Sequence, residues 1–208
     1  MKISYAITVC NELKEITHLL NLLIKKKRKQ DEIVILFDKK NGTPEVWDRI
    51  TELKDDGCCS YHAKTFKHHF ADWKNQLTKL CSGDYIFQID ADEYPHDSLI
   101  SQLPVILEAN PENEVYLIPR VNTVKGLTEE HIQKWGWNVN DKGWVNWPDA
   151  QCRIYKNIET ISWAKPVHEQ LSGYKTVSKL PDAEEYSILH VKDIKRQERQ
   201  NEFYSKNY

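Results

Sequence analysis

Three acidic side chains stand close together directly after an apolar run, in the segment YIFQIDADEYP at residues 85–95. The apolar residues suit a strand that is buried on both faces. On a regular strand, the one-residue spacing of Asp90 and Asp92 would place both carboxylates on the same face. Two carboxylates in a partly buried site repel each other unless a cation neutralises them. Because oxygen ligands suit hard divalent ions, the segment predicts a Mn²⁺ or Mg²⁺ site, with a solvated loop as the alternative.

The elements that must position these acids follow from the pattern of apolar residues. Apolar, β-branched runs predict three buried strands, at residues 3–10, 32–37 and 85–89. Helical spacing of apolar residues predicts three helices, at residues 13–24, 47–53 and 73–80. This alternation is typical of a parallel α/β sheet, in which ligands bind at the carboxyl ends of the strands. Asn11 (the expected cap of the first helix), Asp38 and the acids at 90–93 all follow predicted strands.

The second half of the chain is less regular. We expect a helix that is capped by Asp97 and runs to about Ala109, with Pro104 kinking or splitting it. Further strands are expected at residues 114–119, 151–157 and 187–191, and a charged helical tail from Lys192. The stretch 122–150 is poor in aliphatic residues and contains Trp135, Trp137, Trp144 and Trp147.

The composition narrows the function classes. A chain of 208 residues with 40% hydrophobic content suits one globular domain, and a formal charge of −2 does not favour a nucleic-acid partner. The basic run KKKRK at 25–29 follows an amphipathic segment and is interpreted as a solvated helix end. Five cysteines without paired spacing indicate reduced thiols. Without a signal peptide or a membrane-spanning run, we expect a cytoplasmic protein, in the host cytoplasm if the chain is viral.

Along nearly its whole length the sequence resembles the GT-A fold glycosyltransferases of family 2, including bacterial and viral relatives that glucosylate polysaccharide cores. The segments that carry the resemblance are ITVCNE (7–12), ILFD (35–38), FADWKNQLTKLCSGDYIFQIDADE (70–93), NWPDAQCRIYKN (146–157), KPVHEQLSG (165–173) and ILHVK (188–192). The D-x-D and V-H-E segments together are fairly specific. The resemblance implies an α/β fold with a mostly parallel central sheet flanked by helices and a Rossmann-like N-terminal half.

The resemblance also implies how one domain, 1–208, is organised. Residues 1–95 would bind the nucleotide sugar, and residues 96–191 would bind the acceptor and carry out catalysis. Residues 192–208 would form a helical tail, where further domains could follow.

The implied reaction is a metal-dependent transfer of a hexose from a nucleotide-diphosphate sugar, with UDP-hexose the expected donor, to a glycan, glycoprotein or lipid-linked acceptor. The divalent ion, Mn²⁺ or Mg²⁺, is expected on Asp90, Asp92 and His190. Contacts to the nucleotide sugar are expected from Val9, Asn11, Glu12, Asp38, Lys74, Asp90 and Ala91. Two positions depart from the family pattern: Lys74 replaces a usual arginine, and Cys10 replaces an aromatic residue that commonly stacks on the base.

On the acceptor side, the resemblance makes Glu169 the expected general base, which takes the proton of the attacking hydroxyl. Asp149 is the alternative base, and inversion or retention at the sugar stays open. Acceptor contacts are expected from Trp144, Trp147 and His168, because aromatic faces pack on the C–H faces of sugars. Since tryptophans also fill cores, we expect a split between the two roles. His168 is in addition a weaker candidate for the metal role of His190.

Two other functions stay open. A sugar-phosphate nucleotidyltransferase also holds metal against a nucleotide with paired carboxylates. The chain has only seven glycines, however, and no glycine-rich basic loop near its first strand. A non-catalytic carbohydrate-binding module would explain the tryptophans but would leave the acids and the V-H-E segment without a role.

Overall fold

The computed structural model describes residues 1–207; the side chains of Gln200 and of residues 203–207 lie outside the description, as does Tyr208, the last residue of the expected tail. The strands are β1 (Ile3–Val9), β2 (Glu32–Asp38), β3 (Ser60–Lys64), β4 (Tyr85–Asp90), β5 (Glu93–Pro95), β6 (Val115–Lys125), β7 (Val145–Lys156), β8 (Ser162–Ala164), β9 (Gln170–Ser172), β10 (Val177–Lys179) and β11 (Ile188–Asp193). The helices are α1 (Leu13–Lys26), α2 (Pro44–Asp55), α3 (Phe70–Thr78), α4 (Asp97–Ala109), α5 (Glu129–Trp135), the 3₁₀ turn η1 (Glu184–Tyr186) and α6 (Ile194–Asn207).

Within the described residues, nine strands form one sheet in the order β3-β2-β1-β4-β7-β6-β11-β5, with β10 beside β6. The strands β1 to β4 pair with one another in parallel only, since β1 pairs with β2 and β4, and β2 pairs with β3. The antiparallel pairs are β4–β7, β6–β7 and β5–β11. The expected α/β fold class, with a mostly parallel central sheet and a Rossmann-like N-terminal half, is confirmed.

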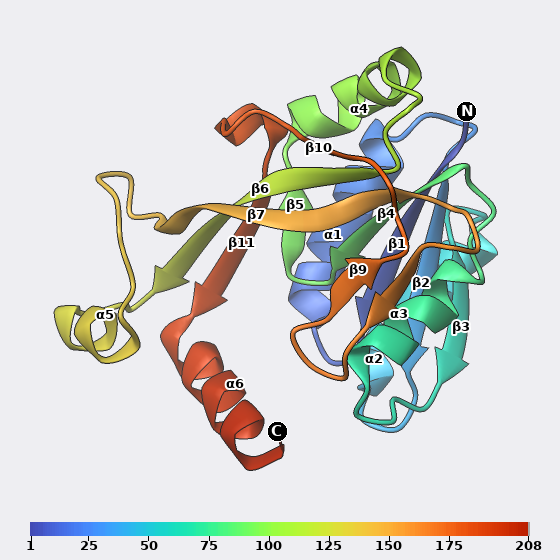
Figure 1. Ribbon diagram of the computed structural model, residues 1–208. Coiled ribbons are helices and arrows are strands. Elements are labelled where there is room, and N and C mark those ends of the chain that lie inside the picture. Colours follow the sequence, from blue (N-terminus) through green and yellow to red (C-terminus); the bar gives the residue numbers. More distant parts are fainter. Residues whose placement is uncertain (208) are drawn as a thin grey trace.

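Helices cover both faces of the sheet because the central strands are apolar on both sides. The helices α1, α2 and α4 pack on one face, where α1 buries Ile16, Leu19, Leu20 and Leu23. The other face is covered by α3, through Trp73, and by the β8–β9 hairpin. Figure 1 shows α3 in front of the sheet and α1 behind it. The loops that follow β1, β2 and β4 are thereby held at one edge of a rigid sheet.

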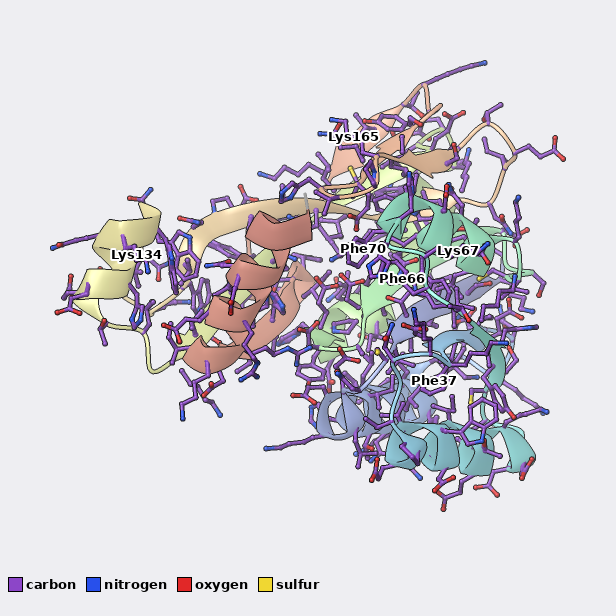
Figure 2. All side chains as sticks on the ribbon, turned by 90° about the horizontal axis from the view of Figure 1, so that it is seen from below. Phe37, Phe66, Lys67, Phe70, Lys134 and Lys165 are labelled. Atoms are coloured by element: carbon purple, nitrogen blue, oxygen red, sulfur yellow. The ribbon has the colours of Figure 1, made fainter. Side chains whose placement is uncertain are left out.

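The second half adds an arm to this layered core. The strands β6 and β7 have 11 and 12 residues and pair along most of their length. Their outer ends project beyond the sheet, with α5 at the tip (Figure 1). In Figure 2, Lys134 of α5 lies at the outer end of the arm, well separated from Phe66 and Phe70 beside α3. The four tryptophans of the stretch 122–150 lie on this arm and belong to neither buried cluster of the described residues.

Several boundaries differ from those expected. The sequence does not predict β3, whose residues alternate between exposed and half-buried, or β5, which has three residues. The helix α1 begins after Glu12 and not after Asn11, and the Glu12 carboxylate accepts hydrogen bonds from the N–H groups of Cys10 and Asn11, which precede the helix. The helix α4 runs continuously through Pro104, which is buried inside it and does not split it.

The basic run at 25–29 is a helix end, as interpreted from the sequence. Lys26 closes α1 and forms an ion pair with Asp97, and Arg28 forms one with Asp31. All five cysteines are free, in agreement with the expected reduced thiols. No helix among residues 1–207 combines the length and the apolar composition needed to cross a membrane.

Candidate active site

A pocket of about 1080 Å³ opens at the carboxyl ends of β1, β2 and β4, where the sequence places its acids. The predicted residues that line it are Val9, Glu12, Asp38, Lys74, Asp90, Ala91, Asp92, His168, Glu169 and His190. Four other predicted residues, Asn11, Asp149, Trp144 and Trp147, lie outside the lining that the described residues form. The expected metal residues, the expected donor residues apart from Asn11, and Glu169 therefore meet in one pocket, whereas Asp149 and the expected acceptor tryptophans lie outside its lining.

Asp90 ends β4 and faces cations of the protein itself. Its Oδ2 accepts a hydrogen bond from Arg153 Nη2 at 2.8 Å, and Lys74 Nζ lies 3.8 Å from its Oδ1. Burial alone would raise the pKa of Asp90, but the charges of Arg153 and Lys74 hold that pKa well below its usual range. Asp90 is therefore kept ionised by fixed side chains.

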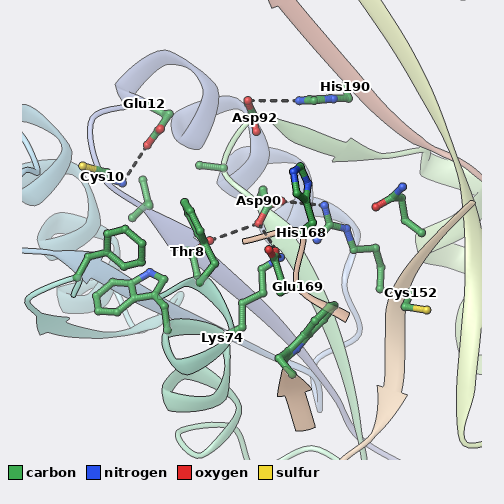
Figure 3. Close-up of a pocket in the computed structure, with 18 of the residues that line it drawn as sticks. Thr8, Cys10, Glu12, Lys74, Asp90, Asp92, Cys152, His168, Glu169 and His190 are labelled. Atoms are coloured by element: carbon green, nitrogen blue, oxygen red, sulfur yellow. Dashed lines mark hydrogen bonds and ion pairs between the residues drawn. The ribbon is translucent and has the colours of Figure 1, made fainter. Parts of the chain in front are cut away.

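Asp92 lies in the turn after β4 and not on the strand, so the expectation that the two carboxylates share one strand face is wrong. Its Oδ2 is 3.4 Å from His190 Nε2 and 3.4 Å from Arg196 Nη2. Figure 3 shows Asp92 and His190 facing each other, apart from Asp90. Burial raises the pKa of Asp92, but the hydrogen bond and charge of His190 outweigh burial and bring the pKa to about 2.

Two side chains beside Asp92's turn, Asp92 itself and His190, carry donor atoms of kinds that a divalent ion accepts. The Asp92 carboxylate and the His190 imidazole form an oxygen–nitrogen pair that Mn²⁺ accepts as ligands. The ring of His190 is oriented by Asn122, whose Oδ1 lies 2.8 Å from His190 Nδ1. Among the described residues, however, no group of three or more His, Cys, Asp or Glu side chains is arranged as a metal site. The expected trio thus separates into the pair Asp92–His190 and an Asp90 that faces Arg153.

Glu169, the expected base, is held by Lys74. Its Oε1 lies 2.5 Å from Lys74 Nζ, and the same ammonium lies 4.7 Å from the centre of the Trp163 ring. Glu169 precedes β9 and Trp163 belongs to β8, so this hairpin places both against α3, which carries Lys74. A backbone hydrogen bond of 2.9 Å from Phe70 N–H to the Pro166 carbonyl ties the same loop to the start of α3. The Glu169 side chain stays 18% exposed, which leaves it within reach of a substrate.

Asp149, the alternative base, is bound through both oxygens. Its Oδ2 accepts hydrogen bonds from Arg120 at 2.9 and 2.7 Å and from Asn122 at 2.8 Å, while its Oδ1 accepts one from Gln151 at 2.6 Å. Burial raises the pKa of Asp149, but the Arg120 charge and these hydrogen bonds give a net lowering. Arg120 also forms an ion pair with the buried Glu93 at 3.1 Å. Asp149 therefore belongs to a network beside the pocket.

On the expected nucleotide side, Asp38 connects two loops. Its Oδ1 accepts hydrogen bonds from the N–H groups of Lys40 and Phe66 at 3.1 Å each, and its Oδ2 accepts one from Asn41 Nδ2 at 2.7 Å. Cys10 also lines this side, and burial raises the pKa of its thiol to about 12. The thiol is therefore neutral at physiological pH and presents a small apolar surface.

The acceptor tryptophans Trp144 and Trp147 line a second, smaller hollow of about 540 Å³. Its other lining residues come from the loop before β7 and from the segment around η1: Asn140, Asp141, Lys142, Asp182, Ala183, Glu184 and Glu185. The long arm carries these tryptophans away from the carboxyl edge of β4, so they do not line the pocket that contains Glu169, and their expected acceptor contacts stay a prediction.

Sequence reasoning missed several residues of the pocket. Arg153 is buried and forms ion pairs with Asp90 and Glu93 at 2.8 and 2.5 Å, and Arg196 of α6 also lines the pocket. Arg153 carried a usable signal, since an arginine inside an apolar strand needs a buried acid as partner. Arg196 carried none, because it is one of several charged residues in a polar tail.

Comparisons with known proteins give a family and a fold. The model of glycosyl transferase family 2 matches residues 4–168. The crystal structure of S. aureus TarS 1-349 in complex with UDP has a TM-score of 0.63 at 14% identity, over 92% of this chain and 60% of that chain. The same fragment with UDP-GlcNAc gives 0.63 at 16% identity, over 92% and 58%. The chain thus spans about 60% of the length of the TarS fragment. Among curated proteins, no sequence matches.

Proposed function

The chain belongs to glycosyl transferase family 2, and from that premise we propose that it transfers a hexose from a UDP-sugar to a hydroxyl group of a glycan or glycan-bearing acceptor. The observation that carries the proposal is one pocket, at the carboxyl edge of the parallel strands, that contains both the Asp92–His190 pair and Glu169. UDP as the nucleotide is supported by the similar fold of TarS, which has been crystallised with UDP and with UDP-GlcNAc.

In this proposal, Asp92 and His190 hold a Mn²⁺ or Mg²⁺ ion. When bound, the ion supplies positive charge beside the donor diphosphate, whose negative charge increases as its bond to the sugar breaks. Lys192 and Arg196 line the same part of the pocket and add cationic charge that the diphosphate can meet. Asp90 is paired with Arg153 but also lines the pocket. Its carboxylate contributes a hydrogen-bond acceptor for the nucleotide sugar.

Glu169 is the proposed base. The acceptor oxygen attacks the anomeric carbon, the bond from that carbon to the diphosphate oxygen breaks, and the Glu169 carboxylate takes the hydroxyl proton. Lys74 holds the carboxylate in place through the 2.5 Å contact. Asp149 is the poorer candidate because Arg120, Asn122 and Gln151 occupy its oxygens.

The test is incubation of the protein with UDP-hexoses and Mn²⁺, followed by measurement of released UDP with and without candidate acceptors. We expect slow UDP release by hydrolysis and faster release with an acceptor. Pyrophosphate formation from UTP and a sugar phosphate would indicate a nucleotidyltransferase instead. Neither product, together with glycan binding, would indicate a binding module.

The Glu169→Gln variant tests the base in the same assay. It keeps the size of the side chain but cannot take the proton, so transfer should fall by on the order of 10²–10⁴-fold while UDP binding stays nearly unchanged. Asp149→Asn is the matched control. A larger loss of turnover in Asp149→Asn, with UDP binding intact, would move the role of base to Asp149.

A further inference from the structure

We propose that the hollow around Trp144 and Trp147 is a second carbohydrate site, distinct from the transfer pocket, which holds an uncharged stretch of a glycan chain. Glycan binding is inferred from the residues of the hollow alone. The identification of that glycan as the acceptor rests on the proposed function. If the glycan bound in the hollow is the acceptor, the arm selects acceptors that are long enough to reach both sites.

The two tryptophans form a built aromatic surface. Their ring centres are 4.7 Å apart with the planes at 61°, and Lys142 Nζ lies 4.3 Å from the centre of the Trp144 ring. Both rings are half-buried, whereas Trp163, which packs in the core, is only 6% exposed. Two tryptophans held in this way against a hollow of about 540 Å³ offer apolar faces of the kind that pack on the C–H faces of sugar rings.

Polar groups around these rings match sugar hydroxyls. Asp141, Asp182 and Glu185 supply carboxylate oxygens that accept hydrogen bonds from hydroxyl groups. Two of the carboxylates around the hollow have a lysine nearby, since Lys179 Nζ lies 2.7 Å from Asp182 and Lys142 Nζ lies 3.8 Å from Glu184.

The charge of the hollow selects among glycans. Its lining carries four acids, Asp141, Asp182, Glu184 and Glu185, and one cation, Lys142; Lys179 beside Asp182 adds a second cation, so the net charge stays negative. Glycans with phosphates or uronic acids would meet this negative charge and be repelled. The structure therefore points to a neutral glycan and not to an anionic polymer.

The strand β7 connects the hollow to the transfer pocket. It begins beside the hollow, with Trp147 on it, and continues to Gln151, Cys152 and Arg153, which line the transfer pocket. At the strand rise of about 3.3 Å per residue, Trp147 and Arg153 are separated by on the order of 20 Å along β7. A chain of several sugars could span that distance, so its distal part would rest on the tryptophans while its end reaches Glu169.

The test is calorimetric titration of the full chain, without donor, with hexamers of neutral glycans (malto-, cello-, laminari-, manno- and chito-oligosaccharides) and with oligogalacturonate as the anionic probe. We expect at least one neutral hexamer to bind and oligogalacturonate not to bind. Trp144→Ala and Trp147→Ala should each weaken the neutral hexamer by about tenfold or more, the loss typical of truncating an aromatic anchor. Trp137→Ala, on the same arm but outside the hollow, is the matched control and should bind as the wild type does.

Each result of these titrations either supports or overturns the inference. Failure of all neutral hexamers to bind the wild-type chain overturns the inference, as does preferential binding of oligogalacturonate or an equal loss in Trp137→Ala. If a tryptophan variant unfolds, the Glu185→Gln variant tests the hollow instead. It removes one negative charge from the lining and should relax the discrimination against oligogalacturonate. Titration of UDP with Mn²⁺ on the same samples separates the two proposals. UDP binding without glycan binding defeats only the second site, and glycan binding without UDP binding defeats only the proposed transferase function.

Discussion

At the scale of single residues, the two aspartates of the D-x-D segment have different partners although only one residue separates them. Asp90 is the last residue of β4 and is neutralised by Arg153, while Asp92 lies in the following turn and faces His190. A carboxylate already paired with a buried arginine gains less from a metal ion than one beside an imidazole. In the proposed metal site we therefore expect Asp92 to contribute more to binding the ion than Asp90 does.

The first prediction concerns Asp92→Asn. The amide is a weaker ligand without charge, so we expect the Mn²⁺-dependent part of UDP binding to be lost while any metal-independent binding stays. The measurement is calorimetric titration of UDP with Mn²⁺ and with EDTA. Asp72→Asn, an exposed position on α3 outside the pocket lining, is the control. Full Mn²⁺ dependence in Asp92→Asn would remove the aspartate from the metal site.

The second prediction concerns Lys74, whose side chain is 5% exposed between Glu169 and Asp90. Lys74→Met removes the cation and leaves Glu169 without this partner, so the free energy of unfolding should fall. We expect a loss of about 1–3 kcal/mol in urea titrations, below the cost for a fully buried pair because Glu169 is partly exposed. Lys74→Arg keeps the charge and should recover most of the loss. Equal losses in both variants would show that the shape of the lysine matters and its charge does not.

Much of the pocket could be predicted from residue types. Asp38 and Asp90 end strands and Asp92 closely follows one, and the carboxyl ends of parallel strands meet at one edge, so their convergence follows from topology. The pairing of Glu169 with Lys74 could not be predicted, because 95 residues separate them and a short hairpin of low periodicity brings them together. The position of Trp144 and Trp147 could not be predicted either, because it depends on how far β6 and β7 extend.

At the scale of secondary-structure elements, Glu32 fastens the amino ends of three neighbouring strands. Its carboxylate accepts hydrogen bonds from Lys2 Nζ at 2.6 Å, from Ser4 on β1 at 2.5 Å, and from Ser82, just before β4, at 2.7 and 2.8 Å. Burial alone would raise the pKa of Glu32, but these hydrogen bonds lower it from 4.5 to about 2. The ionised carboxylate is therefore a part of the folded sheet.

The third prediction follows from the sign of that pKa shift. A carboxyl group with a lowered folded pKa adds stability above its unfolded pKa, and this stability is lost as the pH falls from about 4.5 toward 2. Glu32→Gln should lower the free energy of unfolding by about 1–3 kcal/mol at pH 7, and by less at pH 3. Urea titrations at both pH values measure the difference. Glu45→Gln, exposed at the start of α2, should show no such dependence. A constant Glu32→Gln effect at both pH values would contradict the assignment.

The elements themselves were predictable where burial is two-sided. β1, β2 and β4 have continuous apolar runs, and α1 has a full apolar stripe, so their sequence patterns are strong. β3 lies at the sheet edge with alternating exposure, and β5 has three residues, so neither has enough apolar residues to produce a pattern. The helix α5 buries none of its residues, so only its ends carry a signal, in the capping box at Thr128 and the left-handed C-cap at Gly136.

At the scale of the whole molecule, the two expected halves share one sheet. The boundary at residue 95 falls between β5 and α4, yet β4 pairs with β7 and β5 pairs with β11 across it. Arg153 of the second half forms ion pairs with Asp90 and with Glu93, which is fully buried in the first half. The nucleotide side and the acceptor side of the expected domain are therefore joined by both hydrogen-bonded strands and buried charges.

The last prediction is that the chain unfolds as one unit and that residues 1–95 do not fold alone. Without β7, the strand β4 would expose an unpaired edge, and without Arg153 the buried carboxylate of Glu93 would lose a 2.5 Å partner. Far-UV circular dichroism reports on both halves, whereas fluorescence of a variant that keeps only Trp47 and Trp73 reports on the first half. The two urea transitions should coincide. A separate, earlier transition of either probe, or a cooperative transition of the isolated fragment 1–95, would show that the halves are independent domains that only share an edge.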